Sequence, residues 1–353
     1  MASASIDTRS IAAAVERDGY VVVKSFLDKE LIAQARRDLE AIYARDLEER
    51  RLRNDDTPLF THGSTKSSLS PVSHLVLGLP GKSKALDRCY EKIFSDPATR
   101  DLIRAIAGDH IKIRDVNCRY MTGADDPGDF RNGPHEWHRD SDGEFCIAIP
   151  LNEVPPGENG ATAVIPGSHR YPWDPRWKGM FGAPFYISRE PLERGPSLLA
   201  RLNPFNRLLF KRRMKNHTGT FAEPGDFYIF LNDTWHGRVP NRHGERPMIV
   251  MAGAFPTDFP FPDNPAPFPP NVIAHLPPTY ARAVARDAPV NTNKDSIIHR
   301  MLRERKRDRP TDLFWWARKE REAMVALCQL PMWLYKRVSF MRPLVRRLTR
   351  YPP

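Results

Sequence analysis

The pattern of apolar and polar positions predicts a helical opening to this chain. Residues 10–17 are predicted to form a short helix, and a β-branched strand follows the break at Gly19. Asp28 can cap a second helix that runs to about residue 51, because apolar residues recur there at helical spacing. Residues 86–107 show the same spacing. We interpret these helices as scaffold for a sheet formed later in the chain.

The middle of the chain alternates as β-strands do. The predicted strands cover residues 111–121, 145–151, 227–231 and 248–253. In the first of them, alternation places Asn117 and Arg119 on one face together with Ile111, Ile113 and Asp115. Polar side chains at such positions are unusual in a purely structural sheet, so Asn117 and Arg119 are candidates to line a site. The alternative is that Arg119 pairs with an acid at the rim.

Three segments fall outside this pattern. Residues 54–84 are rich in Ser, Gly, Thr and Pro, and we expect a long loop there that folds over the mouth of a site. An insertion at 171–218 begins with aromatic residues and ends with apolar residues among Lys and Arg. We expect one domain at 1–257, a proline-rich connector at 258–293 and a tail of basic amphipathic helices at 294–353. The helical stretches expected in the tail are 295–308, 312–329 and 332–349.

Charge is distributed unevenly along the chain. Its formal net charge is +11, yet residues 294–353 alone hold 16 Lys and Arg against 6 Asp and Glu. Residues 189–215 add 8 basic residues against 2 acidic ones, which leaves the rest of the chain net acidic. A mildly acidic core argues against nucleic-acid binding and predicts that two basic appendages meet an anionic surface or partner.

Cysteine usage and hydropathy bear on the compartment. The four cysteines are scattered without a C-x-x-C pair, so they indicate neither a zinc site nor a disulfide framework. We expect a reducing, cytoplasmic environment. The first residues lack the pattern of a secretory signal, and no apolar run reaches the roughly 18 residues that span a bilayer.

The strongest chemical signal is a pair of residues with a distant third. His138 and Asp140 are two positions apart, so on a strand their side chains share a face. With His236 they would make the 2-His-1-carboxylate triad that holds non-haem Fe(II) and leaves positions open. Alone, a His-x-Asp pair also fits a surface histidine beside a solvated aspartate. His135 and His169 are competing candidates, although His135 would face away from His138 on a strand.

The surroundings of these residues strengthen the iron hypothesis. After the His-x-Asp block come the segment Asn159–Gly160 to Ile165-Pro166-Gly167-Ser168-His169, then Gly225-Asp226, His236 and Arg246, in that order. Over residues 7–256 this set resembles the phytanoyl-CoA dioxygenase-like family of Fe(II)- and 2-oxoglutarate-dependent oxygenases. The resemblance implies an α+β fold. Its core would be a double-stranded β-helix (jelly-roll, cupin-like), with flanking N-terminal helices and a C-terminal helical extension.

The resemblance also implies a site. Fe(II) would be held by His138, Asp140 and His236, leaving positions for 2-oxoglutarate and O2. The distal carboxylate of 2-oxoglutarate requires a planar, bidentate cation, which arginine supplies and lysine does not. Arg246 matches the family's arginine by its distance from His236, although Arg238 and Arg242 lie close enough to compete. The strand that carries Asn117 and Arg119 supplies polar groups near the co-substrate in the family.

The expected reaction follows from the same resemblance. Related halogenating enzymes lack the carboxylate of the triad, so the presence of Asp140 favours hydroxylation of a small organic or lipid-like substrate. Desaturation, ring closure and epimerisation stay open. Two other classes also stay open: a non-catalytic jelly-roll binding protein, and a cupin-like enzyme that uses another metal without 2-oxoglutarate.

The end of the tail suggests a partner. Residues 331–353 hold six Lys and Arg and no acid, interleaved with Trp333, Leu334 and other apolar residues. Such a pattern is typical of a helix that lies in a membrane interface, although Pro343 would split it. Peripheral contact with anionic lipid at the inner face of a membrane is therefore one prediction. The alternatives are helices packed on the barrel and binding of another anionic partner.

Overall fold

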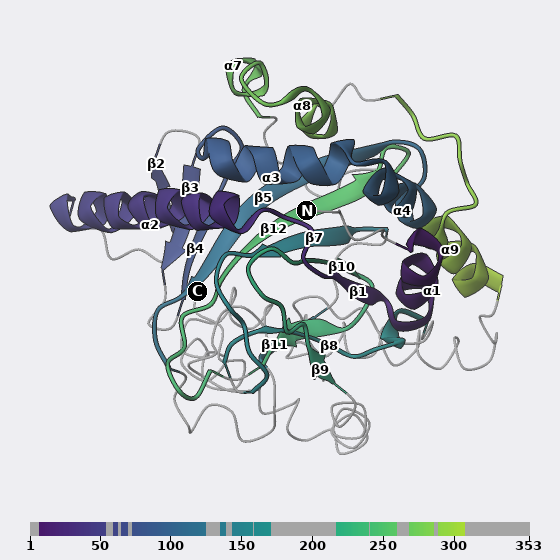
Figure 1. The fold of residues 1–353 in the computed structure, drawn as a ribbon, viewed down its shortest axis with the longest axis horizontal. Helices are drawn as coiled ribbons and strands as arrows, with labels where there is room; N and C mark the ends of the chain where they lie inside the picture. The colour runs from purple at the N-terminus through teal and green to yellow at the C-terminus, as the bar shows by residue number, and fades with distance from the viewer. Residues whose placement is uncertain are drawn as a thin grey trace, which may run out of the picture.

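Two antiparallel sheets form the centre of the computed structural model (Figure 1). The model describes residues 7–53, 59–62, 65–69, 73–124, 135–138, 143–157, 159–170, 217–239, 241–259, 268–285 and 289–307. Within these residues, the main sheet has the order β1 (Tyr20–Val23), β10 (Phe227–Leu231), β7 (Phe145–Pro150), β12 (Met248–Pro256), β5 (Ile111–Met121), β4 (Ser73–Leu77), β3 (Thr65–Leu69) and β2 (Leu59–His62). The second sheet has the order β6 (His135–His138), β11 (His236–Arg238), β8 (Thr162–Val164) and β9 (Thr218–Gly219).

Helices cover one face of the main sheet, and the second sheet lies on its other side (Figure 1). The covering helices are α1 (Thr8–Asp18), α2 (Lys29–Leu52), α3 (Lys84–Ser95) and α4 (Pro97–Ala107). Their predicted positions are confirmed, as is the cap of α2, where the Asp28 carboxylate accepts from the N–H groups of Glu30 and Leu31. Among the described helices, none is long and apolar enough to cross a bilayer.

Alternation along the central strands separates two environments. Phe227, Ile229 and Leu231 of β10 pack on the helix side. Tyr228 and Phe230 instead join a cluster between the two sheets, which we call the barrel interior. It also contains Cys146, Ala148, Val164, Ala222 and Ile249, with Met251 packed against it. The two sheets thus enclose a second, smaller core, as the expected jelly-roll requires.

The faces of β5 differ from the prediction at Ile111 and Ile113, which both pack on the helix side. A register shift between Gly253 and Ala254 of β12 pairs them with Asp115 and Ile113, so β5 carries an extra residue. Ile113 consequently packs on the helix side, whereas we predicted it on the same face as Asn117 and Arg119. Asn117 and Arg119 pair with Met251 and Ile249, whose side chains belong to the barrel interior.

Residues 54–84 are not the structureless loop that the sequence predicts. They supply β2, β3 and β4, which extend the main sheet beyond β5. A buried polar network fastens this extension to α2: Arg50 and Ser67 donate to Asp46, at 3.0 and 2.8 Å, and His74 Nε2 lies 2.8 Å from the same carboxylate. The residue composition did not predict these strands. They are held by pairing with their neighbours and by the hydrogen bonds to Asp46, and intrinsic β-propensity contributes little.

The network makes stability depend on pH. Burial lowers the pKa of His74 even though Asp46 accepts its hydrogen bond. Burial alone would raise the pKa of Asp46. Hydrogen bonds from Ser67, Arg50 and His74 outweigh that effect and leave the pKa below its usual value. His74 therefore stays neutral in the fold at a pH where the unfolded chain binds a proton.

We expect the free energy of unfolding to fall on acidification below about pH 6.5, with His74 contributing up to about 1.4 kcal/mol per pH unit. His74→Gln cannot titrate and should flatten this slope, whereas the same change at exposed His275 should leave it intact. Urea denaturation at several pH values between 7.5 and 5 measures both. Parallel curves for wild type and His74→Gln would show that His74 is not the titrating group.

The predicted connector and the start of the tail pack on the core. The connector contains α7 (Pro270–Ile273) and α8 (Pro278–Val284), and Tyr280 of α8 stacks on Tyr90 of α3 with ring centroids 5.3 Å apart. The first tail helix is α9 (Ile297–Arg307), as predicted, and Ile297 and Ile298 are buried in the main core. Outside the described residues lie 171–216, which make up most of the insertion expected at 171–218, and the tail beyond residue 307.

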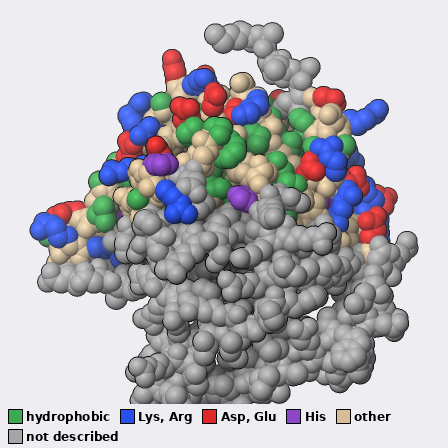
Figure 2. All heavy atoms as spheres, turned by 90° about the horizontal axis from the view of Figure 1, so that it is seen from below, with side chains coloured by type: hydrophobic (Ala, Val, Ile, Leu, Met, Phe, Trp, Pro, Cys, Tyr) green, Lys and Arg blue, Asp and Glu red, His purple; other side chains and the backbone are tan. Residues whose placement is uncertain are grey.

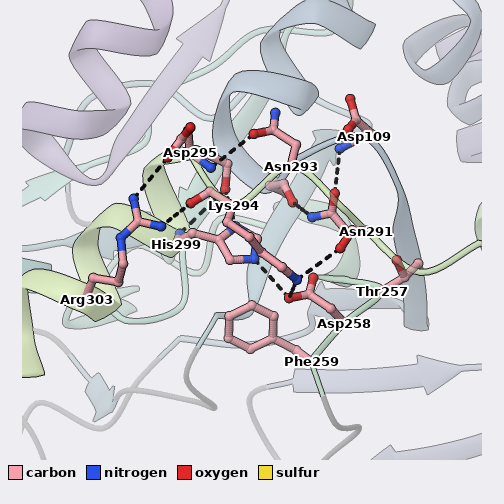
Figure 3. A network of polar contacts seen from close by, with 12 residues as sticks. Asp109, Thr257, Asp258, Phe259, Asn291, Asn293, Lys294, Asp295, His299 and Arg303 are labelled. Atoms are coloured by element: carbon pink, nitrogen blue, oxygen red, sulfur yellow. Dashed lines mark hydrogen bonds and ion pairs between the residues drawn. The ribbon is translucent and has the colours of Figure 1, made fainter.

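Polar contacts tie the start of α9 to the end of β12 (Figure 3). Asp258 accepts from Lys294 Nζ at 2.6 Å and from His299 Nε2 at 3.0 Å, and the ring of Phe259 meets that of His299 edge-on. Asn291 accepts from the N–H of Asp109 and donates to the carbonyl of Ala107 beside the end of α4. Residues on both sides of the boundary expected at 257 therefore pack against each other.

Candidate metal centre

The second sheet brings two of the predicted ligands side by side. Strands β6 and β11 are antiparallel, and His236 pairs directly with His138 although 98 positions separate them in the sequence. Residues that face each other across such a ladder place their side chains on one face of the sheet, close enough to share a ligand. The side chain of His138 lies outside the described part, and the register rests on its backbone.

The imidazole of His236 is buried and held in one orientation. It is 6 % exposed, and its ring lies 5.0 Å from that of Phe230 in the barrel interior. Its Nδ1 is 2.8 Å from the carbonyl oxygen of Thr234. A carbonyl oxygen only accepts, so Nδ1 carries the proton, and Nε2 is the basic nitrogen that a metal ion requires.

The turn before His236 is braced from behind. The hydroxyl of Thr234 donates to the carbonyl of Gly19 at 3.3 Å, and the N–H of Trp235 donates to Ser168 Oγ at 2.8 Å. His169 is buried in a short 3-10 helix, η1 (Ser168–Arg170), with Nε2 3.1 Å from the carbonyl oxygen of Glu16. That contact belongs to the packing of α1 against the turn, so His169 serves the scaffold in this structure.

The chain that follows the predicted ligand Asp140 is tied to the same region. Asp140 itself lies outside the described residues, but the chain after it is anchored. The N–H of Gly143 donates to Asp233 Oδ2 at 3.1 Å, and the N–H of Asn232 donates to the carbonyl of Glu144 at 2.8 Å. These bonds join the β6–β7 and β10–β11 connections, which adjoin the two strands that carry His138 and His236.

No cluster of three or more His, Cys, Asp or Glu side chains suited to a metal ion occurs within the residues whose side chains the structure describes. Of the predicted triad, only the side chain of His236 is among them. His135, the competing candidate on β6, pairs with Arg238, because a register shift separates it from the His138–His236 pair. The assignment of the three ligands therefore stays a prediction that the backbone register supports.

The candidate residues for the co-substrate lie in different places. Asn117 and Arg119 are half-buried on the strand face that lines the barrel interior. Arg246 is exposed just before β12, and its carbonyl accepts from Asn152 Nδ2 at 2.8 Å. Arg238, two residues after His236, is only 3 % exposed. The sequence indicated Arg238 only as a competitor of Arg246 and gave no sign of its burial.

The Gly225-Asp226 block has a structural role. Asp226 is buried and accepts from the backbone N–H of Ser25, from Lys24 Nζ and from the N–H of Glu223, each at 2.8 Å. The carbonyl of Gly225 accepts from the N–H groups of Phe26 and Leu27. These contacts fix the start of β10 against the β1–α2 turn, so this block sets the position of the strand that leads to His236.

Family comparison agrees with this arrangement. The sequence profile of the family described as phytanoyl-CoA dioxygenase (PhyH) matches residues 15–247, about two thirds of the chain. The chain therefore belongs to the phytanoyl-CoA dioxygenase family, a family of Fe(II)- and 2-oxoglutarate-dependent oxygenases, and its fold is the helix-flanked jelly-roll of that family. A comparison with curated proteins gives no match.

Several solved structures are similar to it at low identity. One is the non-haem α-ketoglutarate-dependent epimerase SnoN from nogalamycin biosynthesis, with 19 % identity over 70 % of this chain and 80 % of that one and a TM-score of 0.42. EctD from S. alaskensis, with 2-oxoglutarate and 5-hydroxyectoine, has 19 % identity over 72 % and 78 % and a TM-score of 0.44. HygX from Streptomyces hygroscopicus, with nickel, 2-oxoglutarate and hygromycin B, has 13 % identity over 71 % and 88 % and a TM-score of 0.42. Similarities of this size say nothing about the substrate of this chain.

Proposed function

We propose that this protein is a dioxygenase that uses Fe(II), 2-oxoglutarate and O2 to hydroxylate a small organic or lipid-like substrate. The observation that carries the proposal is the direct pairing of His236 with His138 in a family member, combined with the Nδ1 contact of His236 to Thr234. This register supports a site in which both imidazoles share one sheet face, and the His236 ring is already in the tautomer that binds metal. Asp140, two residues beyond His138, would complete the set.

The chemistry fits the donor set. Two imidazoles and one carboxylate suit Fe(II) and leave sites for co-substrate and oxygen. When bound with 2-oxoglutarate and O2, Fe(II) supplies the oxidant for inserting an oxygen atom into a C–H bond, with release of succinate and CO2. The protein's own part is to fix the ligands. Thr234 orients His236, and the bonds from Gly143 and Asn232 hold together the connections that adjoin strands β6 and β11.

The co-substrate would extend from the metal into the barrel interior. From the sequence, Arg246, Asn117 and Arg119 are proposed to bind it. The position of Asn117 and Arg119 on the interior face supports their part in this proposal. A cationic group beside the interior is required because the distal carboxylate would otherwise lose its hydration without compensation.

Anaerobic titration of the full-length protein with Fe(II) and 2-oxoglutarate tests the proposal. The expected result is a visible charge-transfer band that needs both components, followed in air by release of succinate. Metal binding without any effect of 2-oxoglutarate would instead favour a cupin-like enzyme of another kind. Absence of both metal binding and the band would favour a non-catalytic binding protein.

The basic tail adds a proposal about location. We propose that residues 331–353 contact anionic lipid from the cytoplasmic side, which would give access to a lipid-like substrate. On the described part of the face seen in Figure 2, basic and acidic side chains are interspersed, which agrees with an excess of positive charge carried by the appendages. Screened electrostatic attraction plus burial of Trp and Leu would drive such binding.

We expect the full chain, but not a version ending at Pro310, to co-sediment with anionic vesicles at low salt and to be released at high salt. Neutral vesicles should bind neither form. If both forms pelleted equally and negligibly with anionic vesicles, the proposed membrane contact would be wrong. The tail would then be scaffold or a site for another partner.

A further inference from the structure

A buried imidazole fastens the start of the C-terminal tail to the end of β12. His299 of α9 is buried, with Nε2 3.0 Å from Asp258 Oδ2 and Nδ1 2.6 Å from the hydroxyl oxygen of Ser296. Lys294 Nζ donates to the same oxygen of Asp258 at 2.6 Å. Burial alone would raise the pKa of Asp258, but the hydrogen bonds from Lys294 and His299 outweigh it and lower that pKa. We call these four residues the α9 clasp.

The residue after Asp258, Phe259, extends this attachment toward β7 (Figure 3). Its ring meets the imidazole of His299 edge-on, with the ring centroids 5.3 Å apart. Its carbonyl accepts from Lys112 Nζ of β5 at 2.6 Å, and its N–H donates to the carbonyl of Pro256 at 3.0 Å. Contacts from α9, β5 and β12 thus fix both the ring and the backbone of Phe259.

The ring of Phe259 lies directly on Gly143. A Cβ atom built on Gly143 would be 2.6 Å from Phe259 Cε1 and 2.7 Å from Cδ1, so the ring fills the place of a side chain. Gly143 is buried, and its N–H donates to Asp233 Oδ2, three positions before His236. It is also the first described residue after Asp140, three positions further along the chain. Phe259 therefore packs on the junction between the segments that adjoin two predicted ligands.

The helix behind this contact is firmly seated, and it lies outside the part of the chain that the family profile matches, residues 15–247. Ile297 and Ile298 of α9 are buried in the main core. Arg300 Nη2 also donates to Glu16 Oε1 of α1 at 2.8 Å. The C-terminal extension of this chain thus reaches the neighbourhood of the metal centre through one aromatic ring.

We infer that Phe259, held by His299, is a positioning residue of the metal centre, which fixes Gly143 and through it the segment that carries Asp140. This inference rests on the proposed function. Because Gly143 has no side chain to pack, its place depends on its bond to Asp233 and on the ring that covers it. A ligand must be held within about 0.5 Å of its productive position, so a looser Gly143 lowers metal affinity.

Calorimetric Mn²⁺ titration of the full-length protein tests this inference, with urea unfolding measured on the same variants. Phe259→Ala uncovers Gly143 and should lower the Mn²⁺ affinity of the folded protein by about tenfold to a hundredfold, the usual effect of losing a residue that supports metal ligands. His299→Ala releases the ring and should lower the affinity by about tenfold. Phe259→Leu keeps much of the apolar volume and should stay within about threefold of the wild type.

A double variant separates positioning from a general loss of stability. His299 is inferred to act through Phe259, so Phe259→Ala combined with His299→Ala should bind Mn²⁺ no more weakly than Phe259→Ala alone. The visible absorption of bound Co²⁺ gives a second readout, which a purely structural role would not change. At saturating Co²⁺, the spectrum of Phe259→Ala should resemble that of Asp140→Ala more closely than that of the wild type.

Arg303→Gln is the matched control. Arg303 lies one turn beyond His299 on α9, and its pair with exposed Asp295, at 3.2 Å, belongs to the surface. This variant should keep the Mn²⁺ affinity and the Co²⁺ spectrum of the wild type, because it leaves Phe259 and the α9 clasp intact.

Unchanged Mn²⁺ affinity in folded Phe259→Ala would overturn the inference, and so would additive losses of affinity in the double variant. If Phe259→Ala does not fold, an unchanged affinity and Co²⁺ spectrum in His299→Ala would overturn it equally. A wild-type protein that binds neither metal ion would contradict the proposed function itself. That failure is seen in the unaltered chain, so it is distinct from an unaffected Phe259 or His299 variant.

Discussion

His236→Ala is expected to abolish metal-dependent decarboxylation of 2-oxoglutarate and to weaken Fe(II) binding by at least about a hundredfold. The imidazole of His236 is buried, directly opposite His138, and oriented by Thr234, so alanine removes a ligand for which no other described side chain is placed to substitute. His138→Ala and Asp140→Ala should have the same effect, since two remaining ligands hold a divalent ion poorly. Calorimetric Fe(II) titration under anaerobic conditions and succinate release measure the two losses separately.

The matched control is His275→Ala, because His275 is exposed and lies beyond the β12 strand. It should behave as the wild type in both assays. Near-normal turnover in any one of the three ligand variants would remove that residue from the triad, and His135 would then be the next candidate on β6.

The order of the motifs along the chain predicted the fold, which no single motif could do. The cap at Asp28, the strand at 227–231 and the first tail helix follow from local rules that act on a few neighbouring residues. The pairing of His138 with His236 agrees with the sequence-based expectation of a shared site, but the sequence alone does not give a register.

Features that depend on distant partners were missed. The strands β2 to β4 form because β4 pairs with β5 and because Asp46 on α2 accepts hydrogen bonds from Arg50, Ser67 and His74. No local sequence pattern predicts these contacts. The extra residue in β5 moved Ile113 to the opposite face, since a bulge reverses alternation. Likewise, the inward orientation of Arg238 follows from the phase of β8 and β11, and its spacing from His236 in the sequence does not reveal it.

Gly19 illustrates how such distant contacts reach the metal centre. It ends α1 in a left-handed conformation, with φ of +79°. A Cβ atom built there would lie 2.2 Å from Thr234 Oγ1 and 2.6 Å from His169 Nδ1. Both distances are far below van der Waals contact, so Thr234, whose carbonyl orients His236, and His169 must shift at least their side chains if any side chain is added at Gly19.

We expect Gly19→Ala to lower the free energy of unfolding by about 3 kcal/mol, the sum of an unfavourable positive φ and a steric clash inside a packed wall. Denaturant unfolding measures this loss. Because Thr234 would move, Fe(II) affinity of the folded variant should also fall, by about tenfold to a hundredfold.

Gly244→Ala separates the two causes. Gly244 has φ of +69°, but a Cβ there would meet only ordinary contacts, the nearest being Ala124 Cβ at 3.7 Å. It should lose about 1 kcal/mol, the backbone part alone, and keep its Fe(II) affinity. Equal losses of stability in the two variants would mean that the wall formed by Thr234 and His169 yields to a methyl group. The turn before His236 would then owe its position to the bond between Trp235 and Ser168 rather than to close packing against Gly19.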